Sequence, residues 1–203
     1  MSRLNESNVL LAKEIIGRYP RARSATIPLL HLSQQQNGHI TNEAIAHIAE
    51  LVGATPAEVL GTCTFYEMFK MEPVGKYLVN ICGTMSCQLM GSEELMHHAE
   101  HVLGVKAGGT TADGMFTLEH AECQAACTEA PNVQVNYRHC HRMTTEAFDQ
   151  LIDDLRNGRR EGDIPAHGTL ARVRQQIPAD RAAGAASPDA PVSPAWMPAP
   201  EVK

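Results

Sequence analysis

Cysteine is the residue whose spacing in this 203-residue chain points most clearly to chemistry. Four of the six cysteines stand in two close pairs. Cys82 and Cys87 have four residues between them, Cys123 and Cys127 have three, and 35 residues separate the pairs. Thiolates are soft ligands that suit iron–sulfur clusters and zinc, and disulfides are rare in the cytoplasm. The two pairs are therefore predicted to ligate one metal centre.

Other thiol chemistry fits these pairs less well. A thioredoxin-type dithiol uses Cys-x-x-Cys, which the chain lacks. A Rieske centre needs a histidine close to a cysteine in each loop, and only Cys140-His141 juxtaposes the two, in the wrong arrangement. A structural zinc site with four cysteines tolerates three- or four-residue gaps. Spacing alone therefore leaves an iron–sulfur cluster and a zinc site open.

Small residues flank the paired cysteines. Gly83, Gly91 and the pair Ala125-Ala126 would let backbone N–H groups approach the sulfurs closely. Four methionines are expected to pack near the centre: Met85, Met90, Met96 and Met115.

The remaining cysteines and histidines are given structural roles. Cys63 is predicted to be a small buried residue on a helix. The tract His139-Cys140-His141 follows a predicted strand and precedes a helix cap, which favours a surface turn over a metal site. The histidines at 97, 98 and 101 are expected on the solvated face of one helix.

The elements that must position the cysteine pairs follow from hydrophobic periodicity and from caps. Helices are predicted over about 9–19, 27–36, 41–53, from 55 onward, 92–103 and 145–157, and buried or alternating strands over 76–82, 115–120 and 133–137. Thr41 is an expected N-cap, Thr55-Pro56-Ala57-Glu58 an expected capping box, and Ser92 the expected start of the helix over 92–103. Cys82 closes one strand and Cys123 follows the next, so a sheet edge would unite both pairs.

This order predicts an α+β fold. Residues 1–72 form an N-terminal helical bundle, and residues 73–158 a thioredoxin-like domain with a mixed sheet of about four strands. Residues 159–203, rich in Pro and Ala, are expected to be a flexible tail without a packed core, in which Trp196 stands out.

Composition excludes several other classes of protein. Seventeen basic and 23 acidic residues give a formal charge of -6 without long runs of either sign, so no nucleic-acid partner is expected. The sequence contains no signal pattern and no apolar run near the roughly 18 residues of a membrane span, which predicts a cytoplasmic chain without direct membrane insertion. Neither G-x-G-x-x-G after a strand nor a Walker A motif occurs, so any NADH or flavin is expected on another chain.

Residues around both pairs resemble one known family. The segments 65–69 (FYEMF), 73–76 (PVGK) and 82–87 (CGTMSC) are similar to the thioredoxin-like [2Fe-2S] subunit of respiratory NADH:quinone oxidoreductase (complex I), called the E subunit in bacteria. The segments 114–118 (GMFTL), 122–127 (ECQAAC) and 130–136 (APNVQVN) resemble that family's second ligand loop and strand. The resemblance covers about residues 8–158.

Two places depart from the family's usual pattern. Gln124-Ala125 stand where the family often has Leu-Gly, and Met85-Ser86 stand where it often has Thr-Pro. Neither change removes a ligand, so the resemblance still implies cluster binding. Local packing and the reduction potential are the properties that these changes would affect.

The resemblance implies one [2Fe-2S] cluster on Cys82, Cys87, Cys123 and Cys127. It also implies a larger partner subunit that binds FMN and NADH, followed by other iron–sulfur subunits. The chain would exchange one electron with that FMN, as part of an oxidoreductase held peripherally on the cytoplasmic side of the inner membrane, and would perform no bond-making chemistry alone. NAD-reducing hydrogenases and NAD-linked formate dehydrogenases contain relatives of the same shape and are the alternative hosts.

Overall fold

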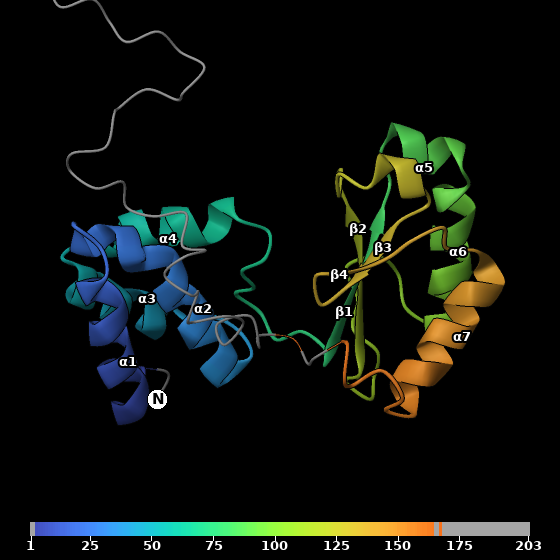
Figure 1. Cartoon of the computed structure of the whole chain (residues 1–203). Helices are drawn as coiled ribbons and strands as arrows, with labels where there is room; N and C mark the ends of the chain where they lie inside the picture. Colours follow the sequence, from blue (N-terminus) through green and yellow to red (C-terminus); the bar gives the residue numbers. More distant parts are fainter. Residues whose placement is uncertain (1–2, 165–166, 168–203) are drawn as a thin grey trace, which may run out of the picture. The chain divides into compact units, whose positions relative to one another are not determined.

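The structure is a computed structural model that describes residues 3–164 and 167 (Figure 1). These residues belong to one compact unit with an α+β fold, which confirms the predicted fold class. Their buried apolar side chains form two hydrophobic clusters, one among the N-terminal helices and one around a sheet. The expected tail from residue 168 onward, including Trp196, lies outside the described residues. The domain limits at residues 72 and 158 stay a prediction.

Short helices make up the N-terminal part of the described chain. They are α1 (Glu6–Gly17), η1 (Ala22–Ala25), α2 (Thr26–Asn37), α3 (Asn42–Val52) and α4 (Pro56–Phe65). Their inward faces bury a cluster that includes Leu29, Leu30 and Ile48, each fully shielded from solvent. Burying a side chain of this size contributes about 1.5–3 kcal/mol. Packing, more than intrinsic helix propensity, therefore holds these helices of 12 residues or fewer.

The predicted caps fix the ends of α3 and α4. The Thr41 side chain caps α3, and Gly53 ends that helix in the left-handed conformation at φ 66°. Thr55 and Glu58 form the predicted capping box, with Pro56 at the first helical position. The side chains of Thr41, Thr55 and Glu58 accept hydrogen bonds from backbone N–H groups that would otherwise lack a partner at a helix start. Gly53 supplies the left-handed conformation that ends α3.

The first helix differs from its predicted range. It begins at Glu6 and not near Val9, because the Asn5 side chain accepts a hydrogen bond from the Asn8 N–H at 2.9 Å and acts as the N-cap. It also ends at Gly17, before the helix breaker Pro20 is reached.

A mixed sheet of four strands follows in the described residues, as predicted. Its strands are β1 (Tyr77–Cys82), β2 (Phe116–Ala121), β3 (Val133–Val135) and β4 (Arg138–Cys140). Their spatial order is β2-β1-β3-β4; β1 runs parallel to β2 and antiparallel to β3, and β3 runs antiparallel to β4. All six residues of β1 are buried, as befits a central strand.

The helices of this part are α5 (Met85–Leu89), α6 (Ser92–Leu103), η2 (Cys127–Glu129) and α7 (Thr145–Arg156). Helices α6 and α7 lie beside the sheet (Figure 1), and their apolar faces join its core. From α7 the buried side chains are Phe148, Leu151, Ile152 and Leu155. Ile164 is also buried in this cluster, so the core extends past residue 158, where packing was predicted to end.

The pairing of β1 with β2 positions the cysteine loops. In the parallel register Cys82 lies opposite Ala121, the last residue of β2. Both strands therefore end at the same edge of the sheet, and the segments that follow them begin side by side.

Two predictions about the strands are wrong: the place of residues 139–141, and the end of the strand over 133–137. The tract at residues 139–141 was expected in a surface turn, but His139 and Cys140 belong to the edge strand β4. The chain reverses earlier, at Asn136 and Tyr137, which have φ values of 46° and 67°. The Asn136 N–H still donates to the Leu78 carbonyl at 3.0 Å, but the Leu78 N–H donates to the Asn136 side chain at 2.8 Å and not to its carbonyl, and β3 ends at Val135.

Helix α6 begins at Ser92, as predicted. Its N-cap is Gly91 at φ 95°, with no side-chain cap, and Ser92 is buried inside the first turn. The Ser92 hydroxyl has no hydrogen-bond partner among the described residues. The short helix α5, which contains Cys87 of the first cysteine pair, was not predicted because five residues carry too little periodicity.

Candidate metal centre

The four paired cysteines come from two loops at one edge of the sheet. Cys82 is the last residue of β1, and Cys87 lies in α5. Cys123 stands two residues after β2, and Cys127 begins η2. The strand register thus brings the two pairs to the same edge, as expected from their positions at strand ends.

The first pair is buried and well supplied with hydrogen bonds. Cys82 and Cys87 are 2% and 3% exposed. Burial raises the pKa of the Cys82 thiol, but hydrogen bonds from the Thr84 hydroxyl, from the N–H groups of Gln124 and Thr84, and from Cys87 outweigh it and lower the pKa. The Thr84 Oγ1 lies 3.2 Å from the Cys82 Sγ. This buried sulfur is therefore prepared for the thiolate form that metals bind.

Cys87 links the two loops. Burial raises the pKa of its thiol; the backbone N–H of Asn132 opposes this, while interactions with Cys82 and with Cys127 raise the pKa further. The sulfurs of one loop therefore act electrostatically on a sulfur of the other. Thiolates that repel one another in this way are stabilised when a cation lies between them.

The second pair is exposed. Cys123 and Cys127 both face solvent. The Ala125 N–H donates to the Cys123 Sγ at 3.4 Å, and Ala125 adopts a left-handed φ of 57°. That conformation favours glycine, the residue that the resembling family often carries at this position.

The donor set fits an all-cysteine iron–sulfur cluster in its chemistry. It offers four thiols on two loops, and backbone N–H groups directed at three of the sulfurs, Cys82, Cys87 and Cys123. Hydrogen bonds of this kind are among the factors that tune such clusters. Within the part of the chain that the structure describes, no three His, Cys, Asp or Glu side chains are grouped as the ligands of one metal ion.

Glycine is favoured at positions 83 and 91 for reasons other than the predicted approach of backbone N–H groups to the sulfurs. A side chain at Gly83 would overlap the His120 ring, since an added Cβ would lie 1.8 Å from Nε2. Gly91 has open space around it but a φ of 95°, so it is the backbone conformation that favours glycine there.

The two other cysteines stay outside the site. Cys63 is fully buried in the helical cluster, as predicted, and burial raises its pKa to about 11. Cys140 is half-buried on β4, and burial raises its pKa as well.

Some of the predicted packing residues face solvent. Met85 is 77% exposed and Met90 is also exposed, whereas Met96 is buried. His98 is half-buried, with its Nε2 2.7 Å from the Asp149 Oδ1, so the expectation of a solvated face is wrong for this histidine. Its neighbour on the same helix, His101, is exposed as expected.

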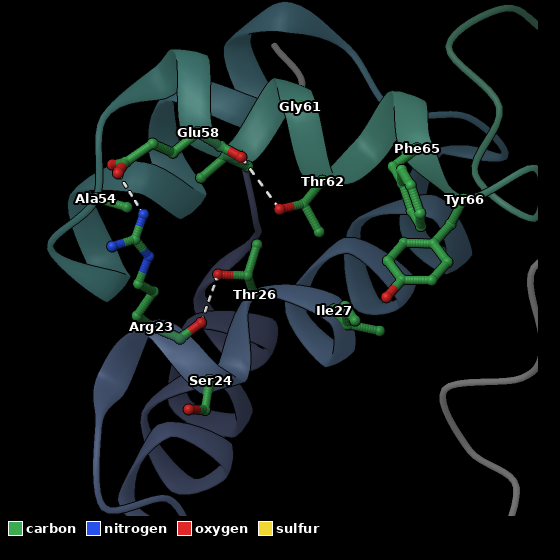
Figure 2. Close-up of a pocket in the computed structure, with 11 residues that line it drawn as sticks. Arg23, Ser24, Thr26, Ile27, Ala54, Glu58, Gly61, Thr62, Phe65 and Tyr66 are labelled. Carbon is green, nitrogen blue, oxygen red and sulfur yellow. Dashed lines mark hydrogen bonds and ion pairs between the residues drawn. The ribbon is translucent and has the colours of Figure 1, made fainter.

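A separate hollow of about 540 Å³ lies among η1, α2 and α4 (Figure 2). An ion pair between Arg23 and Glu58 closes one end, and the rings of Phe65 and Tyr66 stand at the other. The Thr62 hydroxyl at its wall donates to the Glu58 carbonyl at 3.1 Å. The hollow contains no cysteine and offers no donor set for a metal.

No described helix has the length and apolar content that crossing a membrane requires.

Known proteins match the chain over most of its described length. The pattern of the thioredoxin-like [2Fe-2S] ferredoxin family covers residues 12–156. The chain therefore belongs to the thioredoxin-like [2Fe-2S] ferredoxin family.

Several relatives are named as complex I subunits. The E subunit of NADH-quinone oxidoreductase from Mycobacterium tuberculosis (strain H37Rv) is 43% identical over 72% of this chain and 58% of the relative. NADH-quinone oxidoreductase subunit 2 of Thermus thermophilus is 40% identical over 77% of this chain and 88% of the relative. The corresponding figures for the E subunit from Rickettsia conorii are 40%, 75% and 93%. The resemblance to this family of complex I subunits is confirmed, although the chain spans less than two thirds of the mycobacterial relatives.

A solved structure shows the same fold. The crystal structure of an NAD⁺-reducing [NiFe]-hydrogenase in the H₂-reduced state aligns with a TM-score of 0.60 and 21% identity, over 70% of this chain and 24% of that chain.

Proposed function

We propose that the chain is an electron-transfer subunit of NADH:quinone oxidoreductase. It holds one [2Fe-2S] cluster on Cys82, Cys87, Cys123 and Cys127, which exchanges one electron with the FMN of a partner NADH-binding subunit. Relatives of 40–43% identity carry subunit names of that complex, which supports this host.

One observation carries the proposal: the two cysteine pairs lie on loops that begin at the same sheet edge, with backbone N–H groups interacting with their sulfurs. Four thiolates without histidine favour a low potential, of the order of the roughly -400 mV of plant-type ferredoxins. A centre of that potential can accept an electron that originates from NADH. The protein's part is to fix the sulfurs, to direct N–H groups at them and to keep water from the buried pair.

The surface around the site supports a large partner. Cys123 and Cys127 are exposed, and α5 with its C-cap residue presents Met85, Leu89 and Met90 to solvent, with Leu89 81% exposed. Apolar side chains grouped beside a reactive centre are typical of a protein–protein interface. We infer that the flavin- and NADH-binding subunit covers this region and that further iron–sulfur subunits lie beyond it. Through them the chain would be held peripherally on the cytoplasmic side of the inner membrane.

Metal analysis of the full chain tests the cluster. The purified protein is expected to be reddish-brown, to contain iron and acid-labile sulfide in equal amounts, and to give an S = 1/2 EPR signal on reduction. A colourless protein with one zinc per chain would instead establish a structural zinc module built on the same cysteines.

Co-purification tests the host. Recovery of an FMN-containing NADH dehydrogenase subunit together with quinone-reducing subunits is expected. Recovery of hydrogenase or formate dehydrogenase subunits without them would move the chain to an NAD-reducing hydrogenase or an NAD-linked formate dehydrogenase.

A further inference from the structure

Two polar side chains connect the second cysteine loop to the sheet. The Gln124 side chain donates from Nε2 to the Asn80 carbonyl of β1 at 3.0 Å. Its Oε1 accepts a hydrogen bond from Nδ2 of Asn132. Asn132 is fully buried, and Gln124 is half-buried. A buried amide needs partners, since an unpaired one costs about 1–3 kcal/mol. The bond between the two side chains is therefore a constraint on both segments.

The backbones of the same two residues serve the buried cysteine pair. A backbone hydrogen bond from Gln124 lowers the pKa of the Cys82 thiol, and one from Asn132 opposes the raised pKa of the Cys87 thiol. In return, the Asn132 carbonyl accepts from the Cys82 N–H at 3.2 Å. One side-chain bond thus joins the two residues that supply an N–H group to each buried sulfur.

The side chains of Gln124 and Asn132 are also connected to the edge strand β4. The Nδ1 of His139 on β4 lies 3.0 Å from Nδ2 and 3.3 Å from Oδ1 of Asn132. The other ring nitrogen of His139 lies 3.0 Å from Nε2 of Gln134. The connected side chains therefore reach from β1 through Gln124 and Asn132 to β4.

We propose that Gln124 and Asn132 form a positioning pair that holds two backbone N–H groups on the sulfurs of Cys82 and Cys87. This role rests on the proposed function, because the pair would tune a cluster held by those sulfurs. Reduction adds negative charge to a cluster, and N–H groups directed at its sulfurs stabilise that charge. Loosening the pair should therefore make the reduction potential more negative.

Leucine replaces both amides without adding a charge. In Gln124→Leu and Asn132→Leu the bond between the two side chains is lost while an apolar group of similar size fills the space. EPR-monitored redox titration of each loaded variant is expected to give a more negative midpoint potential and shifted g-values. Because either substitution breaks the same bond, the double variant is expected to shift less than the sum of the single variants.

Gln134→Leu is the matched control. Gln134 is also half-buried and also contacts His139, but among the described residues no hydrogen bond joins it to a cysteine sulfur. The midpoint potential and g-values of the Gln134→Leu variant should equal those of the wild type. Unchanged values in Gln124→Leu, additive shifts in the double variant, or an equal shift in Gln134→Leu would overturn the proposal.

Hydrogen exchange separates this proposal from the proposed function. The wild-type chain is loaded first; if it binds no iron and sulfide, the proposed function fails whatever the variants do. If Gln124→Leu alone binds no cluster, backbone amide exchange is measured on the metal-free full chain. Faster exchange at Asn132 in Gln124→Leu, but not in Gln134→Leu, supports the positioning pair. Unchanged exchange there would overturn it.

Discussion

The two cysteine loops achieve the same purpose by different means. The first loop lies at the end of the central strand β1 and continues into α5, so Cys82 and Cys87 are buried by the fold itself. The second loop follows β2, passes through the left-handed Ala125 and leaves Cys123 and Cys127 exposed.

This difference indicates that the chain by itself shields only the first cysteine pair from solvent. Regular structure positions the first pair, whereas side-chain hydrogen bonds of Gln124 and Asn132 tie down the second loop. The exposed pair lies on the side where a partner would exclude water. Under the proposed function, in which a partner chain holds the flavin, one half of the site is expected to be closed and the other open.

Thiol reactivity in the metal-free chain should show the largest contrast. At pH 8 we expect iodoacetamide to modify the exposed Cys123 and Cys127 first and the buried Cys63 last. Because the Cys63 pKa lies about 11 rather than 9.0, its thiolate is about 100-fold scarcer at this pH. Its rate should then rise about tenfold for each pH unit up to 10, and urea should abolish the difference. Mass spectrometry of tryptic peptides measures the rates; early modification of Cys63 would contradict its assigned burial.

A substitution at Gly75, whose backbone lies against the start of β2, is expected to affect stability most. An added Cβ at Gly75 would lie 2.8 Å from backbone atoms of Phe116, which cannot move aside as a side-chain end can. Gly75→Ala is therefore expected to lower the free energy of unfolding by about 1–3 kcal/mol, measured by urea denaturation. Gly61→Ala, at a helical site with nothing within 4 Å of the added Cβ, is the matched control and should not destabilise the chain. Equal losses in both would refute the close approach of Gly75 to the start of β2.

The second loop should tolerate the opposite substitution. Ala125→Gly relieves a left-handed φ that costs an L-residue about 1–2 kcal/mol, while the added flexibility of the unfolded chain costs about 0.5–1 kcal/mol. The free energy of unfolding is expected to stay constant or rise by up to about 1 kcal/mol, with cluster content retained. A loss of more than about 1 kcal/mol would show that the Ala125 methyl group packs against something essential.

The smallest effect on stability is expected on α5. Leu89 is 81% exposed, so Leu89→Lys should change the free energy of unfolding by no more than about 0.5 kcal/mol. The same variant should recover much less of the flavin-containing partner by pull-down, because a charge would enter the proposed interface. His101→Lys, at an exposed position on α6, adds the same single charge and is the control for charge alone. Full recovery by Leu89→Lys would remove α5 from the interface.

Local sequence predicted those parts of the fold that local interactions determine. The Thr55–Glu58 capping box, the cap at Thr41 and the buried strand into Cys82 all follow from neighbouring residues. Helix α5 and strand β4 were missed because they are short and depend on tertiary contacts, such as the hydrogen bond from the Leu78 N–H to the Asn136 side chain just after β3.

The candidate site, too, could be predicted only where the signal lies in neighbouring residues. Cysteine spacing predicted which four sulfurs to consider, and the strand register places them on two loops at one edge. The roles of Gln124 and Asn132 could not be predicted, since their mutual bond joins residues of two segments whose distance only the fold determines. The departure from Leu at position 124 was the one available signal.

Iron content of six single cysteine variants tests the central claim most directly. After identical reconstitution with iron and sulfide, Cys82→Ser, Cys87→Ser, Cys123→Ser and Cys127→Ser are each expected to lose the S = 1/2 signal of the wild-type cluster and most of the bound iron. Cys63→Ser and Cys140→Ser should keep both. Retention of the wild-type signal in any of the first four, or equal loss in all six, would contradict the assignment of the cluster to the two loops.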